Sequence, residues 1–315
     1  MASHSSSSAH RLRLVDPIDI DEPLHDENAQ SWQLTELLAR SRQADLYRAR
    51  PAGQSDNDLS LYLVKLIRQP AASDPAIRRA IADEAAVGQA VSHPHLIPVL
   101  GHHARHERPF LVMPHLPGAS LDHVLRHAGP LPVPHALWIV RQIAEAIAAV
   151  HEAGWLHGDI KPANIVVSTQ GHATLIDLGS VMRRDQQLNR GGRERPLIGT
   201  LAYVAPEMLT SDRAIGPAAD MYSLGATLYE LLTGTSPFGQ LSPADLARAH
   251  LHSRPPELNQ MVPHVPPAVS RLTHQLLAKD PLRRPGSMPE LISHLLQLEI
   301  DTLPMRWDQS RPTAA

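Results

Sequence analysis

Cysteine is absent from the 315 residues of this chain, and aromatic residues make up only 3% of it. The first absence excludes disulfide bonds, thiolate zinc sites and a cysteine nucleophile. The second means that the core is built from aliphatic side chains, and the apolar share of 43% is enough for one large domain or two small ones. The formal net charge of -3 gives no general attraction for nucleic acid or for an acidic membrane.

Long hydrophobic runs are also missing. No stretch approaches the run of about 18 apolar residues that a membrane span needs. The Ser- and His-rich start, residues 1–10, lacks the apolar centre of a signal peptide. We therefore expect a cytoplasmic protein with no membrane span.

The pattern of apolar residues divides the chain into a strand-rich part and a helix-rich part. Short alternating runs predict strands, and one helix is expected to begin at Asp74-Pro75 and to run to about Val91. The expected strands lie at 32–38, 46–50, 61–67, 97–101 and 110–113. Apolar residues at intervals of three and four then predict helices. These lie at 137–150, 220–232, 268–278 and 289–298.

The expected fold is therefore α+β with two lobes: a small β-rich lobe with one key helix and a larger α-helical lobe. We expect a disordered arm at residues 1–27 and one domain at 28–300, followed by a tail at 301–315. The small lobe covers about 32–115 and the large lobe about 118–300.

Two charged residues lie on faces that are otherwise apolar. Lys65 shares a strand face with Leu63, and Glu84 shares a helix face with Ile77 and Ile81. Burying either charge alone costs several kcal/mol. The two therefore pair with each other or with a charged ligand between the lobes. The alternative is that the strand is an edge and that Lys65 extends its amine to water.

Four polar residues lie on two short loops, each beside an apolar run. Asp159, Lys161 and Asn164 belong to the first loop, and Asp177 belongs to the second. A carboxylate can accept the proton of an attacking hydroxyl, and a lysine can offset charge on a transferred phosphoryl group. An amide and a second carboxylate are oxygen ligands that suit Mg²⁺. The spacing therefore favours phosphoryl transfer.

Here the sequence resembles the protein kinase family, in particular bacterial, eukaryotic-like (Hanks-type) members of the Ser/Thr type, over about residues 32–300. Its motifs stand in the order of the family's signature set. They are Lys65 in Leu63-Val64-Lys65, Glu84, Asp159 with Asn164, Asp177-Leu178-Gly179, Gly199-Thr200 before Tyr203, Ala205-Pro206-Glu207, the run 220–225, and Asp280-Pro281 with Arg284-Pro285.

The resemblance implies a serine/threonine protein kinase that uses ATP with Mg²⁺ or Mn²⁺. Asp159 and Lys161 would be catalytic, and a lysine at position 161 is typical of Ser/Thr rather than tyrosine kinases. Asn164 and Asp177 would hold the metal ion. Lys65, paired with Glu84, would contact the phosphates of ATP. The remaining nucleotide contacts would come from Leu38, Ala39, Leu46, Leu63, Met113, Leu116 and Val166.

The resemblance carries further expectations. Met113 would be the gatekeeper of the nucleotide site, residues 114–116 would form the hinge, and Glu207 and Arg284 would form a buried ion pair. The expected partners are proteins that carry serine or threonine, with room for a regulatory partner and none for nucleic acid.

The chain departs from the family in the loop that normally holds three glycines. Residues 39–46 read Ala-Arg-Ser-Arg-Gln-Ala-Asp-Leu. Alanine and serine are the next smallest residues, so the loop is expected still to cover ATP, but less closely. Arg40 and Arg42 either bring charge to the phosphates or are simply solvated.

Two other departures concern regulation. Gly158 stands where the family often has an arginine that holds a phosphorylated activation loop, and residues 177–207 offer only Ser180, Thr200 and Tyr203 as hydroxyls. Activity is therefore expected not to require phosphorylation there. Gly88 lacks the bulky side chain expected in the interior of its helix, which is expected to loosen that helix.

Two rival interpretations remain open. His157-Gly158-Asp159 is also typical of small-molecule phosphotransferases of the aminoglycoside or choline kinase type, although these lack the Ala-Pro-Glu and Gly-Thr-x-x-Tyr elements. The glycine-free loop also suits a pseudokinase that serves as a binding scaffold. Retention of Lys65, Asp159 and Asp177 argues against that reading.

Overall fold

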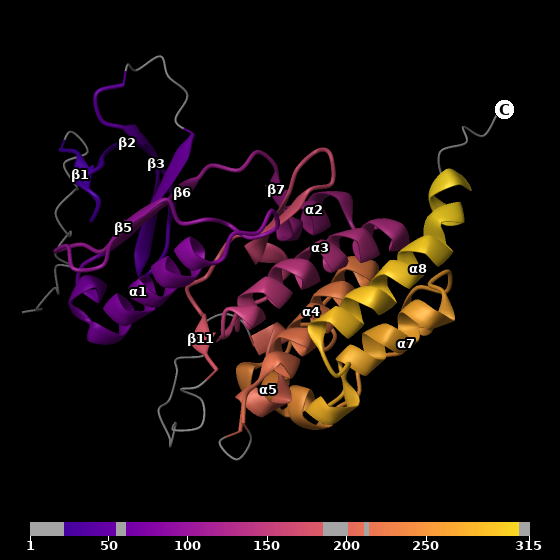
Figure 1. Cartoon of the computed structure of the whole chain (residues 1–315). Helices are drawn as coiled ribbons and strands as arrows, with labels where there is room; N and C mark the ends of the chain where they lie inside the picture. The colour runs from indigo at the N-terminus through magenta and orange to yellow at the C-terminus, as the bar shows by residue number, and fades with distance from the viewer. Residues whose placement is uncertain (1–21, 55–60, 185–200, 211–213, 309–315) are drawn as a thin grey trace, which may run out of the picture.

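Alternating apolar residues build an antiparallel sheet of six strands in the small lobe (Figure 1). The computed structural model describes residues 22–54, 61–184, 201–210 and 214–308. In sheet order the strands are β1 (Leu24–His25), β2 (Ser31–Arg40), β3 (Ala44–Pro51), β4 (Tyr62–Ile67), β6 (Phe110–Pro114) and β5 (Gly101–His103). Trp32, Tyr47 and Phe110 fill one side of the sheet, where each is at most 5% exposed.

One helix, α1 (Pro75–Ala90), lies beside this sheet (Figure 1). As predicted, Asp74 caps it, because its carboxylate accepts the N–H of Ala76 at 2.8 Å. Gly88 does not leave a gap in the helix. A Cβ at this position would lie 2.4 Å from Val99 Cγ2, and the N–H of Val99 donates to the carbonyl of Gly88 at 2.9 Å. Val99 therefore takes the space that a side chain at residue 88 would fill.

Helices form the large lobe around the buried face of α3. They are α2 (Leu121–Ala128), α3 (Val133–Glu152), α4 (Pro217–Thr233), α5 (Pro243–His252), α6 (Leu258–Met261), α7 (Pro267–Leu276) and α8 (Met288–Asp308). Short strands β7 (Ala119–Ser120), β9 (Ile165–Val167) and β10 (Ala173–Leu175) form a second sheet, and β8 (Trp155–Leu156) pairs with β11 (Met182–Arg183). These strands flank the two polar loops.

Among the described residues, α3 is the one helix that is long and apolar enough to cross a membrane by length and composition. Of its most apolar window, 67% is buried within the protein. Leu137, Ile143 and Ile147 of this helix are fully buried. The apolar character of α3 is therefore accounted for by the core of the large lobe.

The two lobes join behind the cleft as well as through the hinge. Leu96, which follows α1, forms a parallel bridge with Leu175 of β10, and the N–H of Ile97 donates to the carbonyl of Leu175 at 2.9 Å. In return, the N–H of Leu175 donates to the carbonyl of His95 at 2.9 Å. This joint fixes the segment after α1 against the large lobe.

The structure confirms the predicted α+β architecture and changes several boundaries. Within the arm expected at 1–27, Leu24–His25 pair with β2 and are therefore ordered; residues 1–21 lie outside the described part. The strand expected at 97–101 is found at Gly101–His103. Helix α8 runs to Asp308, through much of the expected tail. Helices α2, α5 and α6 were not predicted.

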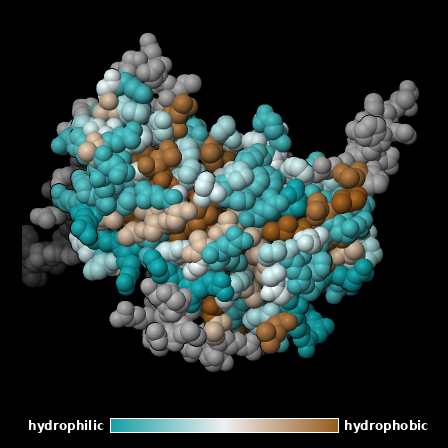
Figure 2. All heavy atoms as spheres, in the orientation of Figure 1, coloured by the Kyte–Doolittle hydropathy of each residue, from teal (hydrophilic) through white to brown (hydrophobic). Residues whose placement is uncertain are grey.

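The outer part of α8 carries exposed apolar residues. Leu296, Ile300 and Leu303 are each about half exposed and share one face at helical spacing. Figure 2 shows this hydrophobic surface along the end of α8.

Candidate active site

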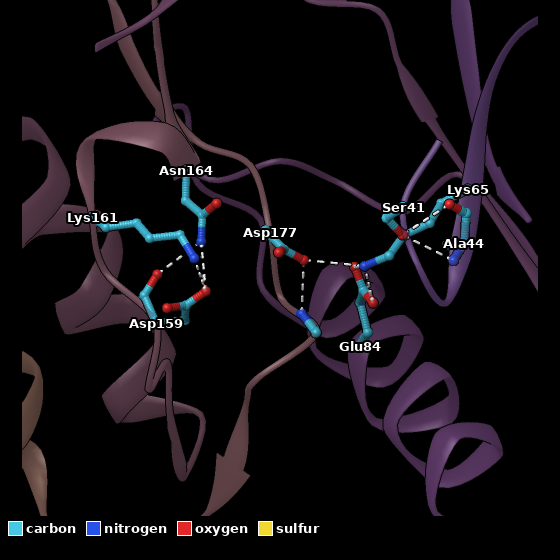
Figure 3. Close-up of polar contacts among 9 residues, drawn as sticks. Ser41, Ala44, Lys65, Glu84, Asp159, Lys161, Asn164 and Asp177 are labelled. Atoms are coloured by element: carbon cyan, nitrogen blue, oxygen red, sulfur yellow. Dashed lines mark hydrogen bonds and ion pairs between the residues drawn. The ribbon is translucent and has the colours of Figure 1, made fainter. Parts of the chain in front are cut away.

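Lys65 of β4 is the centre of a partly buried charge cluster between the lobes, in which the side chains of Lys65, Asp177 and Glu84 are 24%, 40% and 4% exposed (Figure 3). Its Nζ donates to both carboxylate oxygens of Glu84, at 3.0 and 2.9 Å, and to Oδ1 of Asp177 at 3.1 Å. The predicted pairing of Lys65 with Glu84 is confirmed, and the edge-strand alternative is wrong because β4 lies between β3 and β6.

Burial and the contacts within this cluster shift the pKa values of Lys65, Glu84 and Asp177. Burial alone would lower the pKa of Lys65, but Glu84 and Asp177 outweigh it and the pKa is raised. Lys65 holds the pKa of Asp177 at about 2, against the effect of burial. Burial raises the pKa of Glu84, and Lys65 opposes that shift. Lys65 and Asp177 are thus charged at neutral pH.

The catalytic loop between β8 and β9 brings Asp159, Lys161 and Asn164 together, as predicted (Figure 3). Lys161 Nζ lies 2.7 Å from Asp159 Oδ2, and Asn164 Nδ2 donates to the same oxygen at 3.0 Å and to the Asp159 carbonyl at 2.9 Å. The other carboxylate oxygen, Oδ1, is buried and has no hydrogen-bond partner among the described residues. It is therefore the one oxygen of this carboxylate that no described protein donor occupies.

Asp220 of α4 fixes the backbone at the start of the catalytic loop. Its carboxylate accepts the N–H groups of His157 and Gly158 at 2.9 and 2.8 Å and contacts His151 Nε2 at 2.7 Å. Burial tends to raise the pKa of Asp220, but the contacts with His151, His157 and Gly158 outweigh it and the pKa is lowered. The sequence marked the run 220–225 as a motif without indicating this role.

A cleft of about 480 Å³ opens between these groups and the small lobe. All the predicted nucleotide-contacting residues line it: Leu38, Ala39, Leu46, Leu63, Lys65, Glu84, Met113, Leu116 and Val166, together with Asn164 and Asp177 of the predicted metal site. Ile97 and Ile176 also line it and were not predicted as nucleotide contacts, and His115 of the predicted hinge lines it too. The cleft is apolar at the hinge and charged at its inner end.

The sequence matches a known protein family over most of its length. A model of the protein kinase domain matches residues 52–297. The chain belongs to the protein kinase family. It is similar to the serine/threonine-protein kinases PknH and PknE of Mycobacterium tuberculosis strain H37Rv, being 31% identical over 261 residues and 32% identical over 251. It is also 35% identical over 256 residues to the serine/threonine-protein kinase PknD of strain CDC 1551.

These alignments cover 82%, 79% and 80% of this chain, but only 40%, 43% and 37% of the relatives. The kinase chain thus spans about two fifths of the length of the curated relatives that it matches.

The loop that replaces the glycine-rich loop, here called the lid, spans residues 38–46. It consists of the end of β2, the turn at 41–43 and the start of β3, and most of its residues line the cleft. One alternative was that Arg40 is simply solvated. This is wrong, because Arg40 Nε lies 3.1 Å from Asp45 Oδ1. Asp45 is 3% exposed, and Arg68 Nε lies 3.6 Å from the same oxygen. Arg42 is exposed.

The end of the activation segment is anchored to the large lobe. Arg284 forms the predicted buried ion pair with Glu207, at 2.6 Å between Nη1 and Oε1. Tyr203 donates its hydroxyl to Glu230 at 2.5 Å. Gly199 and Thr200 lie outside the described residues.

A polar cluster near Leu201–Tyr203 was not predicted from the sequence. His250 of α5 is fully buried, its Nδ1 contacts the Tyr222 hydroxyl at 2.9 Å, and Lys279 Nζ reaches that hydroxyl at 3.3 Å. Burial lowers the pKa of His250 to about 4 and that of Lys279 to about 8. These residues come from separate helices and loops, so no local pattern brings them together.

Proposed function

We propose that this kinase transfers the γ-phosphoryl group of ATP to serine or threonine hydroxyls of other proteins. The observation that carries the proposal is the unpartnered Oδ1 of Asp159, which is buried beside Lys161 and Asn164. In the reaction, the hydroxyl oxygen forms a bond to the γ-phosphorus while the bond to ADP breaks, and Asp159 receives the hydroxyl proton. Lys161 offsets charge on the transferred group.

The nucleotide fits the cleft by its chemistry. Aliphatic side chains at the hinge end offer two apolar faces for adenine, and Lys65 at the inner end supplies the cation that phosphates require. Lys65 is already oriented by Glu84 before any ligand is present. Orientation in advance lowers the cost of ordering the lysine when ATP binds.

The donor set at the inner end suits a divalent cation. Asp177 Oδ1 accepts both Lys65 Nζ and the N–H of Gly179 at 3.1 Å each, while its second oxygen is left for a metal ion. Asn164 donates through its amide nitrogen, which leaves its oxygen as a ligand. Mg²⁺ or Mn²⁺ bound by this pair would neutralise charge on the phosphates.

We further propose a cytoplasmic protein whose partners are proteins with serine or threonine, without nucleic acid and without a membrane span of its own. ATP is an intracellular substrate, and the apolar face of α3 is taken up by the core. A regulatory partner is compatible with this assignment.

The deciding experiment is incubation with labelled ATP, Mg²⁺ and a generic protein substrate, followed by phosphoamino acid analysis. We expect label on phosphoserine or phosphothreonine and none after the metal is chelated. The glycine-free lid favours a pseudokinase as the second candidate. Nucleotide binding with no transfer of label would support the pseudokinase and overturn the proposed activity.

A further inference from the structure

The lid turn is closed by a side chain, the hydroxyl of Ser41. Ser41 Oγ accepts the N–H of Ala44 at 3.0 Å and donates to the carbonyl of Ala44 at 2.9 Å (Figure 3). It also accepts the N–H of Gln43 at 3.3 Å. One oxygen atom thus collects two backbone N–H groups from the same turn. Of the three residues in this arrangement, Ser41 and Ala44 line the cleft.

Backbone N–H groups of a turn are the donors with which nucleotide-binding loops hold phosphate oxygens. In this lid, two of them already have an oxygen partner that belongs to the protein. The N–H of Ser41 is also taken, by the carbonyl of Ala44 at 2.8 Å. A phosphate that uses the turn therefore has to displace the Ser41 hydroxyl or do without its N–H groups.

The lid does not depend on this hydroxyl for its position. Arg68, just after β4, donates its backbone N–H to the carbonyl of Gln43 at 2.8 Å and its Nη1 to the carbonyl of Ser41 at 3.0 Å. Asp45 holds Arg40 from the other side of the turn. Removal of Ser41 Oγ thus frees two donors without releasing the turn from the sheet.

We propose that the hydroxyl of Ser41 is an internal substitute for a phosphate oxygen and that it sets the affinity of this kinase for the phosphates of its nucleotide. Ser41 is a specificity-determining residue in this role, because it acts on phosphates and not on adenine. The inference rests on the proposed binding of ATP in the cleft.

The test is titration calorimetry with Mg²⁺–ATP and with adenosine on the wild-type chain and on Ser41→Ala. We expect Ser41→Ala to tighten ATP binding about tenfold, the weight of one hydrogen bond to a charged acceptor. Adenosine affinity stays unchanged because adenosine has no phosphate. Ser41→Thr is the matched control, since it keeps the hydroxyl oxygen and is expected to bind ATP as the wild type does.

The outcomes separate this inference from the proposed function. If the wild type binds neither ligand, the proposed function fails. If the wild type binds ATP and Ser41→Ala binds it equally or more weakly, the inference is wrong and Ser41 only supports the hairpin. An equal gain for ATP and adenosine also overturns it. A thermal melt of each variant shows that the compared chains are folded.

Discussion

The catalytic loop and the lid face each other across the cleft and are held in different ways. In the catalytic loop, Asp159, Lys161 and Asn164 match the family's motif, and buried Asp220 fastens the backbone from below. In the lid no glycine of the family motif is kept, and the turn is held to the sheet by the partly exposed Arg40 and Arg68.

The difference shows where chemistry constrains residue type. The catalytic loop acts through side-chain atoms, so a change of residue removes the reacting group. A lid acts on phosphates through backbone N–H groups, which every residue but proline carries, so its side chains can change while its path is kept. We therefore expect large effects from changes in the catalytic loop and small effects from changes in the lid.

Asp159→Asn is expected to give the largest effect. Loss of the proton acceptor should lower kcat roughly a thousandfold. The melting temperature should barely move, because asparagine keeps one side-chain oxygen for the contacts with Lys161 and Asn164. Steady-state kinetics and a thermal melt measure both. Turnover at the wild-type rate would remove Asp159 from the mechanism.

Asp220→Ala tests the support of the catalytic loop. Three donors lose a buried carboxylate, so the free energy of unfolding should fall by about 3 kcal/mol, as measured by urea denaturation. The folded pKa of Asp220 is lowered, so its contribution is present above the ordinary value of 3.8 and is lost as the pH falls below it. Asp122→Ala, which removes an exposed ion pair with Arg126, is the control and should cost under about 1 kcal/mol. Equal losses for the two variants would contradict the assigned role.

Asp177→Ala is expected to weaken ATP binding about ten- to a hundredfold when Mg²⁺ is present, because the cation loses one of few protein ligands. Calorimetry with and without Mg²⁺ separates this loss from any change in the contacts of Lys65. Undiminished affinity in Mg²⁺ would refute the metal role.

Asp45→Asn tests the ion contacts of the lid, as Asp220→Ala tests the support of the catalytic loop. Asparagine keeps the shape and loses the charge that holds Arg40 and Arg68, whose side chains are 56% and 27% exposed. Since solvent screens such contacts, we expect a loss of only about 1 kcal/mol in the free energy of unfolding. A loss as large as that of Asp220→Ala would abolish the contrast between the two regions.

Removal of phosphate from the activation segment is expected to have the smallest effect. Gly158 replaces the arginine that would hold a phosphorylated segment. Enzyme treated with a phosphatase should keep its initial rate. A large loss that is restored by phosphorylation within residues 178–200 would contradict this expectation.

Much of the active site could be predicted because its residues conflict with their local pattern. Lys65 and Glu84 are charges on apolar faces, and their pairing removes the conflict. Asp159 and Asn164 stand at the fixed spacing of one loop. Such signals are local, and they survive in a single sequence.

The parts that were missed depend on contacts between distant segments. Asp26 lies in an acidic stretch that is typical of a disordered arm, yet it is buried because it accepts the Trp32 indole N–H at 3.0 Å and two backbone N–H groups. Strand β1 has only two residues, too few for any periodicity. The Ser41 hydroxyl was missed because its partners depend on the geometry of one turn.

The contact between Gly88 and Val99 is one of two attachments that fix helix α1. Near its C-terminal end, the carbonyl of Gly88 receives the N–H of Val99, and residue 88 has no side chain to hold the two backbones apart. Near its N-terminal end, Arg78 donates its Nη1 to the carbonyls of Ala104 and His106 at 3.1 and 2.8 Å. Glu84 lies between these two attachments, so the position of its carboxylate beside Lys65 is fixed from both ends of the helix.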